Sequence, residues 1–206
     1  MKDSYKTILA ACEGNYREKG SKFLAYAFPV QSDEETKEIL SIIKKEHHSA
    51  RHHCYAWRIG TEEPAFRTND DGEPSSTAGK PILGQLLKFD VTNIIVVVVR
   101  YFGGTLLGTS GLINAYRTAA ADALTNAQII TKKIEERFML KFSYPEMNTV
   151  MQLIKQENLD ILINRFELDC YLVYSVRKSE AERVSQLFKL LQGVEINKAD
   201  DNQDNC

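Results

Sequence analysis

The sequence lacks the cysteine pairs that mark a disulfide framework or a zinc ribbon. Its four cysteines stand apart without C-x-x-C spacing, at Cys12, Cys54, Cys170 and Cys206, so we expect reduced thiols. Long apolar runs are missing too, because the longest, Val91 to Val99, is far shorter than the ~20 residues of a membrane helix. The first residues carry no apolar signal region. These absences predict a cytoplasmic protein without a membrane partner.

An excess of charge of one sign is also absent. The chain has 26 lysines and arginines against 28 acidic residues, and its net charge is −2. Since the balance holds in both halves, any contact with RNA has to depend on a local patch. The glycine fingerprints of P-loop and dinucleotide-binding proteins are missing as well. We therefore expect neither a broadly basic nucleic-acid-binding surface nor a standard nucleotide site.

Residues 1–130 are predicted to form an α+β domain. Ser32 and Glu35 form a capping box ahead of a helix that should run to about His47. The unbroken apolar run from Ile94 predicts a buried strand. The remaining predicted elements are strands at 5–9, 15–18, 22–30 and 54–59, a polar loop at 60–73, and helices at 78–87 and 112–126.

Residues 131–206 are predicted to form a second domain. Strands at 134–142, 161–168, 170–176 and 194–197 enclose two helices, one introduced by Pro145 and one capped by Ser179. This βαββαβ order is the ferredoxin-like arrangement. We expect Leu187, Phe188 and Leu191 in its core. The acidic tail at 199–206 is expected to be frayed.

A glycine loop follows the buried strand, in the sequence V-R-Y-F-G-G-T-L-L-G-T-S-G from Val99 to Gly111. A strand that enters a helix through glycines presents free backbone N–H groups, which together with Arg100 favour an anion beside Gly103 and Gly104. The structural alternative is that these glycines only permit a tight turn and close packing, with Arg100 in an ion pair.

A second loop, Asp70 to Pro81, concentrates carboxylates and hydroxyls. Asp71 and Glu73 suit acid/base chemistry or magnesium binding, and Thr77 and Lys80 suit an anion. Turn-forming residues are common in such loops, and Thr77 is also a good helix N-cap, so a purely structural role stays open.

All four histidines lie between His47 and His53. A transition-metal site is conceivable at this spacing, but histidines near a helix C-terminus more often satisfy its carbonyl groups. Cys54 beside His53 lacks an identifiable orienting partner for nucleophilic catalysis. We therefore expect no metal and no cofactor.

One small basic cluster surrounds Gly20. Arg17, Lys19 and Lys22 alternate with the aromatic residues Tyr16 and Phe23. Such side chains suit phosphates and bases, although in most hairpins they are merely solvated, and we favour that interpretation here.

Three segments carry a resemblance to a known family. They are A-R-H-H-C-Y-A at 50–56, D-G-E-P with T-A-G-K-P-I-L between Asp71 and Leu83, and V-R-Y-F-G-G with the following L-G and G-L pairs between Val99 and Leu112. In this order they closely resemble the YigZ/Impact family, over about Tyr16 to Asn126. Ser110 and Asn114 depart from the family pattern, where glycine and arginine are typical.

The resemblance implies a first domain with the fold of ribosomal protein S-five domain two and a ferredoxin-like second domain, similar to two consecutive domains of elongation factor G. It also implies a link to translation, because the eukaryotic relative Impact restrains a starvation-responsive initiation kinase through a ribosome-bound activator. That relative carries an extra N-terminal interaction domain, so its partner is not transferred to this chain.

We therefore expect a regulator of translation, initiation-linked or stress-linked, that binds RNA, the ribosome or a translation factor and is more likely not an enzyme. Its expected anion or nucleic-acid contacts are Arg51, Thr77, Lys80, Arg100, Gly103 and Gly104. One alternative is a hydrolase or phosphate-ester-handling enzyme that uses His52, Asp71 and Glu73. Another is a protein-interaction module without chemistry.

Overall fold

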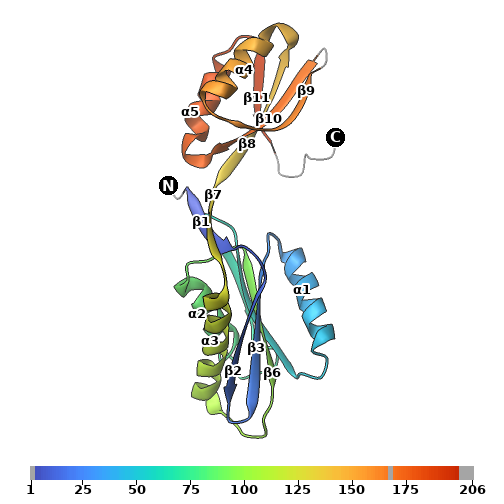
Figure 1. The fold of residues 1–206 in the computed structure, drawn as a ribbon, viewed down its shortest axis with the longest axis vertical. Coiled ribbons are helices and arrows are strands. Elements are labelled where there is room, and N and C mark those ends of the chain that lie inside the picture. Colours follow the sequence, from blue (N-terminus) through green and yellow to red (C-terminus); the bar gives the residue numbers. More distant parts are fainter. Residues whose placement is uncertain (1–2, 167–168, 200–206) are drawn as a thin grey trace. The chain divides into compact units, whose positions relative to one another are not determined.

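The computed structural model describes residues 3–166 and 169–199. The chain divides into two compact units, Ser4–Lys132 and Lys133–Cys206, the second of which also includes Met1–Asp3. Both units combine helices with a sheet (Figure 1). The two-domain α+β class predicted from the sequence is confirmed. Residues 167–168 of a predicted strand and residues 200–206 of the predicted frayed tail lie outside the described residues.

The first unit is built on a five-stranded antiparallel sheet. Its order is β2-β3-β6-β4-β5. Strand β6 lies at the centre and is buried on both faces, which explains its unbroken run of isoleucine and valine. The strands are β2 Cys12–Glu18, β3 Ser21–Pro29, β4 His52–Ile59, β5 Ala65–Asn69 and β6 Ile94–Tyr101.

Helices cover both faces of this sheet (Figure 1). Helices α2 (Gly79–Lys88) and α3 (Gly108–Asn126) pack on one face around the buried Phe23 and Tyr116. Helix α1 (Asp33–Glu46) packs on the other face through Ile43. Two short strands outside this sheet, β1 (Ser4–Ile8) and β7 (Ile129–Lys133), pair with each other.

Most predicted elements of the first unit are present, with two corrections. The Ser32 hydroxyl accepts the N–H of Glu35 at 3.2 Å, which confirms the predicted cap of α1. Strand β5 lies inside the stretch predicted to be a loop. The sequence did not indicate this strand because its residues are mostly exposed and show no apolar alternation. Helix α3 begins four residues before the predicted Leu112, since its polar first turn carries no apolar period.

The second unit has the ferredoxin-like βαββαβ order. Its antiparallel sheet runs β11-β8-β10-β9, and α4 and α5 contribute to the single core on one face. The elements are β8 Glu135–Ser143, the 3₁₀ turn η1 Tyr144–Glu146, α4 Met147–Gln156, β9 Asp160–Phe166, β10 Asp169–Arg177, α5 Lys178–Lys189 and β11 Val194–Lys198.

Helix α5 departs from the sequence prediction at its start and at its buried face. Ser179 does not cap it, because the Ser179 N–H and hydroxyl both donate to the Asp3 carboxylate at 2.9 Å. Phe188 is fully buried as expected, but Leu187 and Leu191 are only partly buried. Leu191 follows the end of α5 and packs against the core. Within the described residues, no helix is both long and apolar enough to cross a membrane.

Candidate functional site

The three sequence motifs meet at one end of the five-stranded sheet. The pairing of β4 with β6 places His52 opposite Arg100. The loop after β5 folds over the start of β4, where the Asp71 carboxylate accepts the backbone N–H of His53 at 2.7 Å. The charged and polar side chains of the motifs therefore gather in one place, although several of them turn inward.

Glu73 is the centre of a buried polar network. Its Oε1 accepts from Nη1 of Arg100 at 2.6 Å and from the Tyr116 hydroxyl at 2.8 Å. The Glu73 and Arg100 side chains are only 4% and 6% exposed. The Sγ atom of Cys54 lies 3.3 Å from the Tyr116 hydroxyl and 3.0 Å from the carbonyl oxygen of Asp70. Burial raises the pKa of the Cys54 thiol and of the Tyr116 hydroxyl, so both groups stay protonated and act as donors.

This network changes the interpretation of Arg100. A buried guanidinium whose charge is compensated by a carboxylate adds no net attraction for an outside anion. The expected anion contact through Arg100 is therefore not supported, and the structural alternative, an ion pair, matches the geometry. Tyr116 is the residue that sequence reasoning missed, since nothing in the helical pattern of α3 distinguishes this tyrosine from an ordinary core residue.

Asp70 organises the second loop. Its carboxylate accepts the backbone N–H groups of Ser76, Ala78 and Gly79 at 2.8 to 3.0 Å, and so satisfies the start of α2. Burial alone raises the pKa of Asp70, but these hydrogen bonds and the charge of Lys80 outweigh burial, and the net pKa is lowered. Thr77 is not the N-cap, because its hydroxyl donates to the Pro74 carbonyl at 2.6 Å.

The histidines of the first motif are tied to the backbone. His52 Nδ1 lies 2.9 Å from the Asp71 carbonyl oxygen, and His53 Nε2 lies 3.2 Å from the His47 carbonyl oxygen. Burial lowers the pKa of His53, against the opposing influence of the His47 carbonyl and Asp71. Within residues 3–166 and 169–199, no group of three histidine, cysteine or acidic side chains is placed to hold a metal ion.

Gly103 packs the glycine loop against the β2–β3 turn. A Cβ atom on Gly103 would lie 1.9 Å from the carbonyl carbon of Gly20, so this position admits only glycine. Its N–H donates to the Ser21 hydroxyl at 3.1 Å and is not free for a ligand. Gly104 differs, because it has a φ of +86° and only open space around the position of a Cβ. The backbone at Gly104 is thus accessible from outside.

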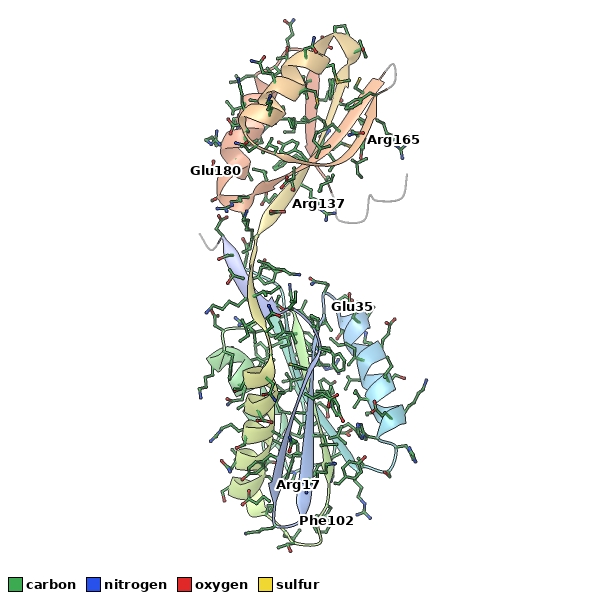
Figure 2. The ribbon with its side chains drawn as sticks, viewed as in Figure 1. Arg17, Glu35, Phe102, Arg137, Arg165 and Glu180 are labelled. Atoms are coloured by element: carbon green, nitrogen blue, oxygen red, sulfur yellow. The ribbon has the colours of Figure 1, made fainter. Side chains whose placement is uncertain are left out.

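The β2–β3 turn presents cations beside this loop. Arg17 and Lys19 are exposed and Lys22 is half-exposed, with Arg17 directly opposite Lys22 in the register. Figure 2 shows Arg17 and Phe102 at the same end of the first unit. We define the tip surface as six exposed or half-exposed residues of the β2–β3 hairpin and the glycine loop: Arg17, Lys19, Lys22, Phe102, Gly104 and Leu106.

Helix α3 points its N-terminus toward the tip surface. Strand β2 and α3 run in opposite directions, since the Asn126 side chain donates to the Glu13 carbonyl while Asp122 accepts the N–H of Asn15. The start of α3 therefore lies near the end of β2 (Figure 1). No side chain caps this start, and the first turn of α3 holds no acidic residue.

The remaining predicted contacts are dispersed. Arg51 is exposed immediately before β4, at the same end of the sheet as the tip surface. Lys80 is exposed on the first turn of α2, whereas Thr77 is buried. His52 is half-buried.

Residues 19–124 match the family described as the Impact N-terminal domain. The chain belongs to the Impact family. This confirms the resemblance found in the sequence motifs. The matched segment of this Impact family chain contains the whole Glu73 network and the glycine loop.

Relatives extend the match into the second unit. An IMPACT family member of Haemophilus influenzae is 36% identical over 169 residues, which cover 81% of this chain and 82% of that protein. The IMPACT family member YigZ of Escherichia coli is 37% identical over 140 residues, 67% of this chain and 69% of YigZ. A crystal structure described as that of a hypothetical protein covers 98% of this chain and 100% of its own, with a TM-score of 0.71 and 28% identity.

Proposed function

We propose that this Impact family chain is a cytoplasmic, non-enzymatic regulator of translation that binds RNA of the translation machinery through its tip surface. The observation that carries the proposal is the group of cations Arg17, Lys19 and Lys22 on one hairpin, held against an exposed glycine loop. The resemblance to Impact supplies the link to translation. The cations on the hairpin support phosphate groups as the class of ligand.

Phosphate groups suit this surface for two reasons. Exposed lysine and arginine side chains gain affinity for RNA by releasing the counterions of each phosphate that they neutralise. The open backbone at Gly104 and the uncapped start of α3 add N–H donors for phosphate oxygens close to the same cations. Arg51, at the same end of the sheet, extends the proposed contact, and Lys80 is a more distant candidate.

The geometry gives the enzyme alternative less support. Asp71 is directed at the backbone of His53, while Glu73 is enclosed with Arg100 and Tyr116. The two carboxylates therefore have separate internal partners and do not converge on one accessible point, as a pair of acid/base groups must.

Co-sedimentation with purified ribosomal particles tests the proposal. The triple variant Arg17→Ala/Lys19→Ala/Lys22→Ala is expected to bind at least roughly tenfold more weakly at low salt, and its binding should depend less steeply on salt. The matched control Lys88→Ala/Lys155→Ala/Lys189→Ala removes three exposed lysines elsewhere and should behave like the wild type. Equal binding by both triple variants, without salt dependence, would contradict the proposal and favour the protein-interaction module.

A further inference from the structure

Phe102 is an exposed aromatic ring with a buried support. Its side chain is 49% exposed, and the Arg100 Cζ atom lies 5.5 Å from the centre of its ring. The same Cζ atom lies 5.5 Å from the ring centre of the fully buried Phe23. Because Glu73 holds the Arg100 side chain at 2.6 Å, the guanidinium that contacts Phe102 is fixed from the interior of the domain.

The hairpin that carries Arg17, Lys19 and Lys22 is joined to the loop of the ring. Ser21, at the base of the β2–β3 turn, hydrogen-bonds the residue that follows Phe102, so the turn that carries Lys19 and Lys22 is attached to the loop that carries the ring. Leu106, in the same loop, is 82% exposed. A half-exposed aromatic ring leaves its apolar surface in water unless a flat partner covers it.

We infer that Phe102 is a stacking site for an unpaired base of RNA, with the Arg17, Lys19 and Lys22 side chains on the phosphates that flank that base. This rests on the proposed function and specifies its ligand as a single-stranded segment. An unpaired base offers a free face to an aromatic ring, and stacking of this kind tolerates any sequence. A duplex hides those faces within its own stack, so it engages the cations but not the ring.

The stacking inference also links the buried Glu73–Arg100 pair to the exposed Phe102 ring. Arg100 does not reach the ligand; it holds the ring from beneath, and Glu73 holds Arg100 in turn. A ring supported in this way loses less conformational freedom when a base stacks on it, which favours binding.

Binding of a short unstructured RNA and of a duplex of the same length, measured by fluorescence anisotropy, tests the inference. Phe102→Ala is expected to weaken binding of the single strand roughly 5- to 150-fold and to leave binding of the duplex unchanged. Leu106→Ala, which truncates another exposed apolar side chain in the same loop, is the matched control and should leave both unchanged.

A second variant supplies a direct signal. Phe102→Trp, made together with Trp57→Phe to remove the only native tryptophan, should bind the single strand as tightly as the wild type. Stacking should quench the emission of the new indole when the single strand is added, and the duplex should not quench it.

The outcomes separate the two levels of the argument. Equal weakening of single-strand and duplex binding by Phe102→Ala, or an indole that the single strand does not quench, overturns the stacking inference and leaves the proposed function standing. Absence of binding to either RNA by the wild type contradicts both.

Discussion

Arg100 and Phe102 are two residues apart, yet the first side chain is buried and the second is exposed. Arg100 is 6% exposed and its charge is compensated by Glu73, whereas Phe102 is 49% exposed in a loop that is hydrogen-bonded to the β2–β3 hairpin. Both belong to one short motif, V-R-Y-F-G-G. The comparison shows that a motif of charged and glycine residues divides into a part that builds the fold and a part that is available to a ligand.

The division follows from strand geometry. Side chains alternate across β6, so Arg100 lies on the same face as Val96 and Val98, which pack beneath the helices α2 and α3. A guanidinium carried into that core needs a partner, and Glu73 provides it from a loop that is distant in sequence. Phe102 follows the end of the strand and escapes this constraint.

The largest effect is expected from breaking the buried pair. Glu73→Ala leaves the Arg100 charge buried and unpaired, which should lower the free energy of unfolding by about 3–5 kcal/mol, measured by urea denaturation. The double variant Glu73→Gln/Arg100→Met removes both charges and should recover most of that loss. A double variant as unstable as Glu73→Ala would show that the pair is not the stabilising element.

A smaller loss is expected at the start of α2. Asp70→Ala removes the acceptor of three backbone N–H groups and should cost roughly 1.5–3 kcal/mol at neutral pH. Because the pKa of Asp70 is lowered in the fold, its contribution is complete above the unfolded value of about 3.9 and is lost as the pH falls through the folded pKa. Urea midpoints for wild type and Asp70→Ala should therefore approach each other in acid, and a constant gap would refute this role.

Tyr116→Phe tests the contribution of the tyrosine hydroxyl to the buried Glu73 network. It removes the hydroxyl that donates to Glu73 while keeping the ring that packs on Phe23, so we expect a loss of about 0.5–2 kcal/mol. Thermal unfolding measures it. No loss at all would indicate that Arg100 alone satisfies the Glu73 carboxylate.

Most of the fold could be predicted from the sequence, because apolar periodicity and the Ser32 cap are local signals. Strand β5 and the first turn of α3 were missed because they lack an apolar period, and the two failed helix caps involve partners outside the local pattern. Thr77 is a residue type that often caps helices, but the Asp70 carboxylate accepts the N–H of Ala78, eight residues downstream. The N–H of Ser179 donates to the Asp3 carboxylate. An ion pair was one of two interpretations of Arg100 from the sequence. The sequence did not indicate Glu73 as the partner, because Glu73 is distant along the chain and is brought to Arg100 by the fold.

The smallest effect on stability is expected at the tip surface. Arg17→Ala, Lys19→Ala and Lys22→Ala remove exposed or half-exposed side chains, so each should change the free energy of unfolding by no more than about 0.5 kcal/mol. Urea denaturation of the three variants checks this. A loss above about 1 kcal/mol at any of them would assign that residue to the fold instead of to a ligand.

The salt dependence of RNA binding tests the central claim most directly, that Arg17 meets phosphate and Arg100 does not. The slope of log affinity against log salt should become shallower by about 0.7 in Arg17→Ala, the value for one phosphate contact on a single strand. The double variant Glu73→Gln/Arg100→Met, measured where it is folded, should keep the slope of the wild type. A shallower slope in the double variant, with an unchanged slope in Arg17→Ala, would contradict the account.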